Sequence, residues 1–227
     1  MCTGAEPFIG LGWIPPSTEA LALVDTRAPT LSDALAQLAE GARSPERTLP
    51  IRVAFALGQW SWQVPLLDST LERAGFDPAQ LVHVTLPDGD SAWAWPQHCD
   101  LETVQANIAT GWGLSVRTTP YGAVAVAGLT AEGEPDFPYD FIALGAAAYL
   151  VVPAGRARAV AQRLAERSLD PANPGIGDTA GTVDPAPIRV LVRSGALLTP
   201  GAAAGPSDRL QAFRIDAHGW STVEPSS

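Results

Sequence analysis

Short apolar runs alternate along the chain with segments of helical spacing, and this alternation predicts both strands and helices. Leu31, Leu35 and Leu38 recur at the spacing of one helix face. The same periodicity predicts helices at 64–74, 100–108 and 155–167. Apolar runs bounded by turn residues predict buried strands at 51–57, 81–86, 114–118, 188–193, 210–215 and 220–223. Interleaved strands and helices indicate an α/β fold, and we expect a mixed sheet with flanking helices.

Two further apolar segments fit either a helix or a strand. They are residues 121–129 and 141–152. Periodicity does not separate the two structures in runs this short. The length and alanine content of 141–152 favour a helix there, while 121–129 stays open.

The chain divides into three parts by composition. Residues 1–167 are expected to form an α/β core domain, and 168–187 is a loop rich in Pro, Gly and Asp. Residues 188–227 supply C-terminal strands, which we assign to the same domain. A chain of 227 residues, with 46% apolar and 17% charged residues, can bury a sizeable core.

Charge and cysteine content narrow the classes of partner and compartment. The net charge of −10 argues against nucleic acid, which requires a basic surface. No run of ~18 apolar residues predicts a membrane span, and the N-terminus lacks the basic region of a secretory signal. Cys2 and Cys99 cannot make a disulfide framework, and whether they pair is open. We therefore expect a cytoplasmic protein.

The stretch FIGLGWIPPSTEALALVD, residues 8–25, has the outline of a β-hairpin. Two apolar runs, 8–11 and 20–24, flank a Pro-Pro-Ser-Thr turn. The question is whether this hairpin holds phosphate or only opens a sheet.

The hairpin is similar in rhythm to the phosphate-binding hairpin of the actin-like ATPase superfamily, which includes sugar kinases and heat-shock chaperone ATPases. WGLSVRTTPYGAVAVAGL, residues 112–129, resembles a chaperone segment in which a strand leads into an alanine-rich helix. DFIALGAAAYL, residues 140–150, resembles the Ala-x-Gly-Ala-Ala helix near the end of such domains. The resemblance implies an actin-like (ribonuclease H-like) remnant.

The motifs that hold nucleotide in that superfamily are not intact in this chain. Gly12 stands where the superfamily has a metal-linked Asp. Ile14, Pro15 and Pro16 replace the residues whose N–H groups hold phosphate, and proline has no N–H to donate. We therefore expect no cofactor and no ATPase activity. What the resemblance leaves is the scaffold role of degenerate superfamily members in protein assemblies.

A second interpretation starts from Cys2. Removal of Met1 exposes a cysteine whose α-amine, with a pKa near ~7.7, lies beside a thiol near ~8.5. N-terminal-nucleophile amidohydrolases use this pairing. The alternative function is therefore a small amidohydrolase with Cys2 as its nucleophile. The three histidines show no metal-ligand spacing, so no metal site is expected.

Tryptophan pairs and an arginine stripe are the candidate binding features. Trp60 and Trp62 share one face of an extended segment directly after the predicted strand 51–57. Exposed tryptophans dominate interface energetics, so we take this pair as a binding surface. Trp93 and Trp95 have the same spacing and suit a core or a sheet edge.

Arg156, Arg163 and Arg167 fall at i, i+7 and i+11 of the helix predicted over 155–167. A basic stripe on an acidic protein is suited to an acidic partner. Together these features predict a non-catalytic scaffold or protein-binding module of a protein assembly. Its partner is expected to be another protein, and the oligomeric state is open.

Overall fold

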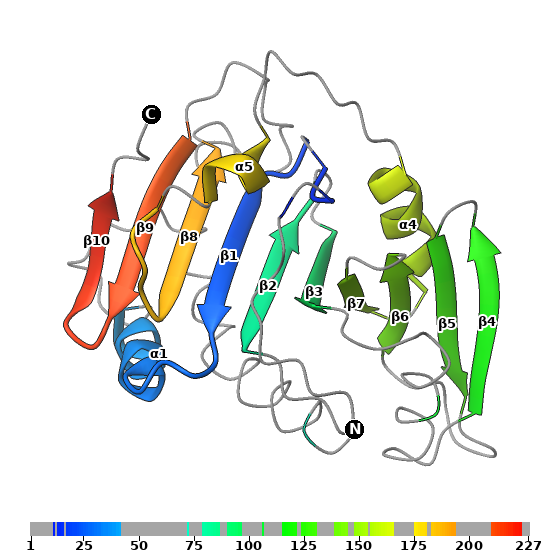
Figure 1. Cartoon of the computed structure of the whole chain (residues 1–227), viewed down its shortest axis with the longest axis horizontal. Coiled ribbons are helices and arrows are strands. Elements are labelled where there is room, and N and C mark those ends of the chain that lie inside the picture. Colours follow the sequence, from blue (N-terminus) through cyan, green and yellow to red (C-terminus); the bar gives the residue numbers. More distant parts are fainter. Residues whose placement is uncertain are drawn as a thin grey trace.

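Figure 1 shows the computed structural model of the chain. The structure describes residues 11, 13–15, 17–41, 72, 79–86, 90–96, 106, 115–121, 124–130, 139–144, 148–153, 155–165, 175–180, 183–193 and 210–223.

Ten described strands form one sheet in the order β10-β9-β8-β1-β2-β3-β7-β6-β5-β4 (Figure 1). Their bounds are β1 (Ala20–Asp25), β2 (Gln80–Thr85), β3 (Ser91–Pro96), β4 (Ser115–Tyr121), β5 (Val124–Thr130), β6 (Tyr139–Leu144), β7 (Ala148–Pro153), β8 (Ile188–Arg193), β9 (Leu210–Asp216) and β10 (Gly219–Val223). All nine pairings between them are antiparallel.

The prediction of a mixed sheet is therefore wrong for the described strands, although strands and helices do coexist as an α/β fold requires. The physical reason lies in the connections. Several consecutive strands, such as β4 with β5 and β9 with β10, pair directly with each other across short turns. A parallel pair instead needs a crossover of a dozen or more residues.

The predicted hairpin over residues 8–25 is also wrong as a pairing. Its second arm forms β1, but β1 pairs with β2 on one edge and with β8 on the other, both along most or all of its length. No edge of β1 remains for residues 8–11. The continuous apolar run at 20–24 is typical of a strand buried on both faces, and β1 lies inside the sheet between two other strands.

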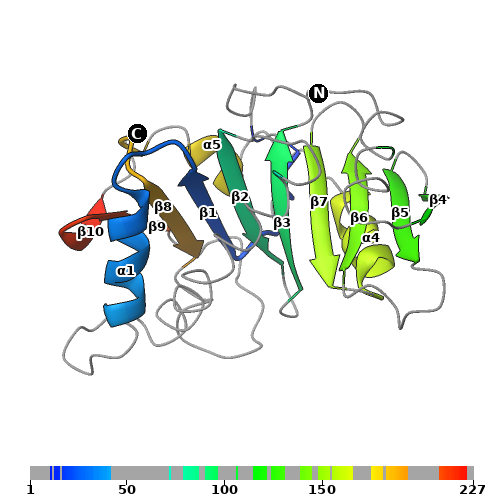
Figure 2. The ribbon, with the colours of Figure 1, turned by 90° about the horizontal axis from the view of Figure 1, so that it is seen from below.

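Helices lie on both faces of the sheet, α1 on one side and α4 and α5 on the other (Figure 2). Helix α1 (Leu31–Gly41) contacts β9 and β10, and α4 (Ala157–Ala165) contacts β4 to β7. Helix α5 (Ile176–Ala180) contacts β1. We call the two surfaces of the sheet the α1 face and the α4/α5 face.

A core cluster of buried residues lies on the α4/α5 face. The alternation of side chains along each strand shows which strand residues face this side, because successive side chains point to opposite faces of the sheet. Leu21, Leu23, Val82 and Val84 point there from β1 and β2 and are almost fully buried. Helices α4 and α5 add small and β-branched residues to the same cluster, namely Ala157, Val160, Ala161, Ile176 and Ala180.

The segment before β1 belongs to this core and is tied to β8. Trp13 and Ile14 are both buried in the cluster. At the end of β8, Arg193 donates from its backbone N to the Glu19 carbonyl at 2.9 Å and from Nε to the Thr18 carbonyl at 3.1 Å. The stretch that resembled a phosphate-binding turn thus contributes apolar packing at Ile14.

Most predicted elements with a clear period are confirmed where the structure describes them. Predictions for 31–38, 81–86, 114–118, 188–193, 210–215 and 220–223 match α1, β2, β4, β8, β9 and β10. The helix predicted over 155–167 is α4, and the segment left open at 121–129 is largely β5. The loop predicted at 168–187 contains the short helix α5. The strand predicted at 51–57 lies outside the described residues.

The helix favoured over 141–152 is wrong, since this segment belongs to the antiparallel pair β6 and β7. Alanine content suggested a helix, but Val151 and Val152 are β-branched and face opposite sides of β7. Leu150 and Val152 are fully buried on the α4/α5 face. Burial in the centre of the sheet outweighs the local helix preference of the alanines.

Candidate binding site at the β10 end of the sheet

Four of the six residues singled out from the sequence lie outside the described residues. These are Cys2, Trp60, Trp62 and Arg167. Their proposed roles therefore stay predictions.

Arg156 is the residue directly before α4, and its side chain is engaged within the chain. Its carbonyl accepts a hydrogen bond from the Val160 N–H at 3.1 Å, which places it at the N-cap of the helix. Its Nε donates to Asp90 Oδ1 at 2.7 Å, and its Nη2 contacts the same oxygen. Arg163 lies in the last turn of α4 and is half-buried. Arg156 thus has an ion-pair partner within the chain, and its proposed role in binding an acidic partner stays a prediction.

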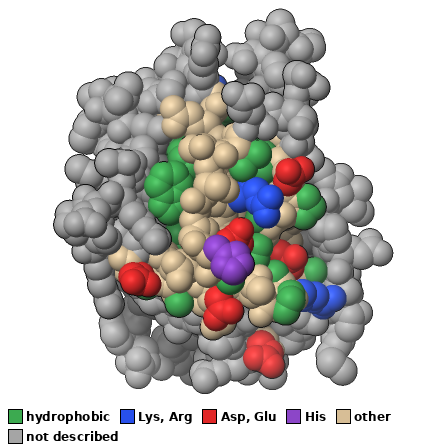
Figure 3. Space-filling model, turned by 90° about the vertical axis from the view of Figure 1, so that its left-hand side faces the viewer, with side chains coloured by type: hydrophobic (Ala, Val, Ile, Leu, Met, Phe, Trp, Pro, Cys, Tyr) green, Lys and Arg blue, Asp and Glu red, His purple; other side chains and the backbone are tan. Residues whose placement is uncertain are grey.

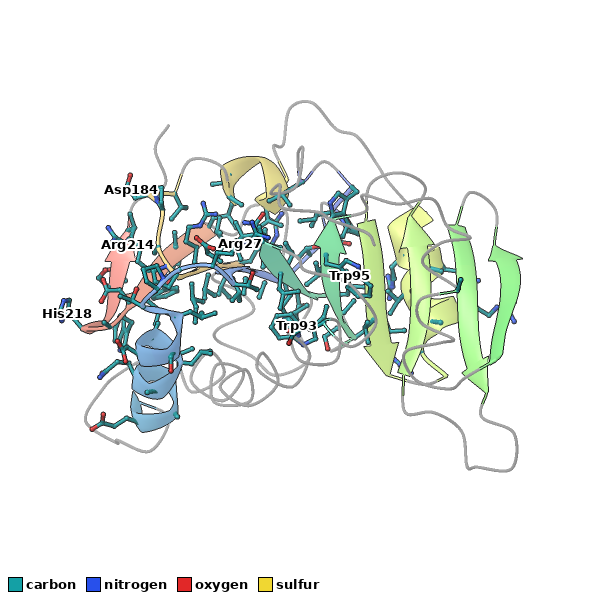
Figure 4. All side chains as sticks on the ribbon, turned by 60° about the horizontal axis from the view of Figure 1, so that its bottom comes forward. Arg27, Trp93, Trp95, Asp184, Arg214 and His218 are labelled. Carbon is teal, nitrogen blue, oxygen red and sulfur yellow. The ribbon has the colours of Figure 1, made fainter. Side chains whose placement is uncertain are left out.

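Trp93 and Trp95 occupy β3 and point to the α1 face, as their spacing predicted. Trp95 is buried, while Trp93 is half-buried and contacts the His83 ring. Burial lowers the pKa of His83 from 6.5 to about 3, so this imidazole is neutral in the folded protein. The three rings therefore belong to the packing of the sheet, and Figure 4 labels the two tryptophans.

Strand β10 is an edge of the sheet, and no described strand pairs with its outer side. Figure 3 views the molecule from this side, where backbone and polar side chains of described residues come to the surface. Ser221 and Thr222 are exposed, and Trp220 is half-buried against the Phe213 ring, at 6.1 Å between centroids. This edge presents main-chain donors and acceptors to its surroundings.

The register shows which backbone groups point outward. Asp216 pairs with Gly219 across the two-residue loop Ala217–His218, so this pair exchanges hydrogen bonds. Pairs alternate along an antiparallel ladder, which turns the N–H and C=O groups of Trp220 and Thr222 away from β9. These are the groups that an added strand would meet.

The two edges of the sheet differ in their protection against pairing. Natural edge strands are commonly blunted by charged residues and proline. The sequence of β4 contains Arg117 and Pro120. The sequence of β10, Gly-Trp-Ser-Thr-Val, contains no charge and no proline. Of the two edges, β10 is the one suited to accept another strand.

Two arginines lie side by side next to this edge, on the α4/α5 face. Arg189 of β8 is directly opposite Arg214 of β9, and Arg214 is directly opposite Ser221 of β10. On its other side Arg189 is opposite Leu23 of β1. Like charges on directly paired residues of neighbouring strands repel each other and destabilise the sheet. The position of these two guanidinium groups therefore needs an explanation.

Sequence reasoning missed both features of this site. An Arg inside each of the apolar strands Ile-Arg-Val-Leu-Val-Arg and Leu-Gln-Ala-Phe-Arg-Ile-Asp, Arg189 and Arg214, was the available signal. The register that brings Arg189 and Arg214 together joins positions 25 residues apart, and no local pattern encodes it.

Searches of protein-family models, curated proteins and solved structures find no match to this chain. The resemblance to the actin-like superfamily therefore stays a prediction. Within the described ranges, no helix is long and apolar enough to cross a membrane. The same ranges hold no group of three or more His, Cys, Asp or Glu side chains placed to bind a metal.

Proposed function

We propose that the chain is a non-catalytic protein-binding module, and that it takes up an extended segment of a partner protein along the outer edge of β10. The edge of β10, which contains no charged residue and has no described strand on its outer side, carries this proposal. Strand addition uses main-chain hydrogen bonds for affinity and alternate side-chain pockets for specificity. The role as scaffold or binding module of a protein assembly follows from this capacity.

The surroundings of β10 support an extended partner. Its outward N–H and C=O groups belong to Trp220 and Thr222, which are two residues apart. This is the spacing at which an added antiparallel strand forms its hydrogen bonds. Behind it stand nine further strands in register, so the edge is held in place before a partner arrives. A preformed edge lowers the ordering cost of binding, which then falls on the partner segment alone.

Site-specific photo-crosslinking tests the proposal in the cell that makes the protein. A photoreactive phenylalanine analogue at Thr222 is expected to give a covalent adduct with a second polypeptide, which mass spectrometry identifies. The same analogue at Gln162, an exposed position of α4, is the matched control and is expected to give none.

A second variant separates edge pairing from mere proximity. Thr222→Pro removes the outward N–H, whereas Thr222→Val keeps it with a side chain of similar shape. The adduct formed from a crosslinker at Ser221 should be lost in the proline variant and kept in the valine variant. An adduct that survives Thr222→Pro, or no adduct at either edge position, contradicts strand addition at β10.

A further inference from the structure

The guanidinium groups of Arg189 and Arg214 are short of acceptors among the described residues. In both side chains Nε is buried and lacks a hydrogen-bond acceptor. Arg189 donates from Nη1 to the Val183 carbonyl at 3.3 Å. A buried donor without an acceptor is costly, and native structures contain few of them.

The nearby carboxylates are engaged mainly with their own turns. Asp216 Oδ1 accepts the His218 N–H at 2.8 Å, and its Oδ2 lies 4.0 Å from Arg214 Nη2, beyond hydrogen-bond distance. Asp25 Oδ1 accepts the Arg27 N–H at 3.0 Å. These two acids moderate the local positive charge without occupying the Nε edges of the guanidinium groups.

Among the described residues, Asp184 is a further acid at this end of the sheet. It is exposed, and Figure 4 shows it on the segment that leads into β8, near the end of the sheet that carries Arg214. No ion pair joins it to Arg189 or Arg214 within the described residues. Burial lowers the pKa of Arg189, while the Asp25 carboxylate raises it. Burial disfavours the charged form of this group, and a bound anion would oppose that effect.

We propose that Arg189 and Arg214 form a binding site for an oxyanion, a phosphate or carboxylate group, on the α4/α5 face of β8 and β9. The Nε and Nη donors on one edge of a guanidinium match two oxygens of such a group. The two adjacent guanidinium groups offer two such edges. The Ser221 hydroxyl lies in the same cross-strand row as the two arginines. Arg214 keeps 34% of its side chain exposed, so an anion can reach it from solvent.

This site does not depend on strand addition at β10. The arginines project from β8 and β9 onto one face, whereas the edge consists of the main chain of β10. A phosphate site without a strand partner, or a strand partner without a phosphate site, is therefore a distinct and recognisable result.

Isothermal titration calorimetry of the full chain with inorganic phosphate tests the site. Titrations with acetate and with chloride at the same ionic strength serve as comparisons. Saturable phosphate binding is expected, and Arg214→Gln should weaken it at least tenfold. Arg214→Lys keeps the positive charge but loses the paired donors of the guanidinium group. Its affinity for phosphate is expected to lie between those of the parent chain and Arg214→Gln. Arg158→Gln on α4, an exposed arginine, removes the same charge elsewhere and should leave binding unchanged.

Acetate identifies the kind of oxyanion. Binding of phosphate without acetate assigns a phosphate group, and comparable binding of both assigns any two-oxygen group. Absence of saturable binding of either anion overturns the proposal. Equal loss of binding in the Arg158→Gln and Arg214→Gln variants overturns it too, because net charge alone would then account for the effect. Circular dichroism and thermal melting establish that each variant is folded.

Discussion

His83 and Trp93 are directly opposite each other on β2 and β3, and their rings meet edge to face, with centroids 4.7 Å apart and planes at 62°. This contact places an ionisable ring in the interior of a sheet face. Because burial lowers the pKa of His83 to about 3, the unfolded chain takes up a proton between pH 6.5 and 3 that the folded chain does not.

The free energy of unfolding should consequently fall as the pH drops from 6.5 towards 3. Each unit of pKa difference between the folded and unfolded chain corresponds to ~1.4 kcal/mol. The loss of unfolding free energy caused by His83 therefore approaches about 4 kcal/mol near pH 3.5. His83→Phe keeps the ring contact with Trp93 and removes the titration. Urea unfolding at several pH values should show a shallower acid loss in this variant than in the parent chain.

The control for this prediction is His218, which is exposed at the tip of the β9–β10 hairpin (Figure 4). His218→Asn replaces an exposed imidazole and so removes a histidine without opening a buried site, and urea unfolding of this variant gives the reference curve. An identical pH profile for the parent and His83→Phe would show that His83 is not the buried group responsible.

Asp90 and Arg156 link the β2–β3 turn to the start of α4. The Arg156 side chain is 52% exposed, so solvent screens this ion pair strongly. We expect a coupling energy of about 0.2–1 kcal/mol in a double-mutant cycle of Asp90→Asn and Arg156→Gln. The coupling should decrease as salt is added. A coupling of several kcal/mol that ignores salt would mean that the pair is shielded from water.

Gly177 of α5 lies against the backbone at Leu11. A Cβ at this position would meet the Leu11 carbonyl oxygen at 2.5 Å, and backbone cannot move aside as a flexible side chain can. Gly177→Ala should therefore destabilise the protein by about 1–3 kcal/mol. Thermal or urea unfolding measures the loss.

Gly155 provides a matched comparison with a different cause. Its φ is +80°, but a Cβ added at this residue would meet nothing within 4 Å, so only backbone strain opposes Gly155→Ala. That strain is worth roughly 1–2 kcal/mol. If Gly177→Ala were harmless while Gly155→Ala were not, the close contact between α5 and Leu11 would be contradicted.

Much of the secondary structure could be predicted because local period encodes it. The helical spacing of Leu31, Leu35 and Leu38 marks the buried face of α1, and apolar runs mark β2 and β8. The partners of these strands could not be predicted, since pairing joins distant segments. β1 pairs with β8, whose residues lie 164 to 172 positions later, and with β2 on its other side, so neither edge of β1 is left for the hairpin expected at 8–25.

The candidate site was hidden for the same reason. A strand lies at the edge of a sheet because no other strand pairs with one of its sides. The sequence of residues 219–223 alone does not show this. Arg189 and Arg214 each lie between apolar residues of their own strand, and only the register of β8 with β9 makes them a pair. The arginine stripe predicted on α4 depended on helical period alone, which gave no sign that Arg156 would pair with Asp90 from a distant turn.

The register of β10 predicts that proline destabilises the protein more at one of two neighbouring positions than at the other. The N–H of Ser221 faces Arg214 of β9, whereas the N–H of Thr222 faces outward. Ser221→Pro should remove a ladder hydrogen bond and lower the free energy of unfolding by about 1–3 kcal/mol. Thr222→Pro should cost less than about 1 kcal/mol, because proline is tolerated on the outward side of an edge strand. Urea unfolding of both variants, with Ser221→Val and Thr222→Val as controls for the side-chain change, checks the order. The reverse order would place the Thr222 N–H in the ladder with β9, and would leave the outer side of β10 without the donors that strand addition requires.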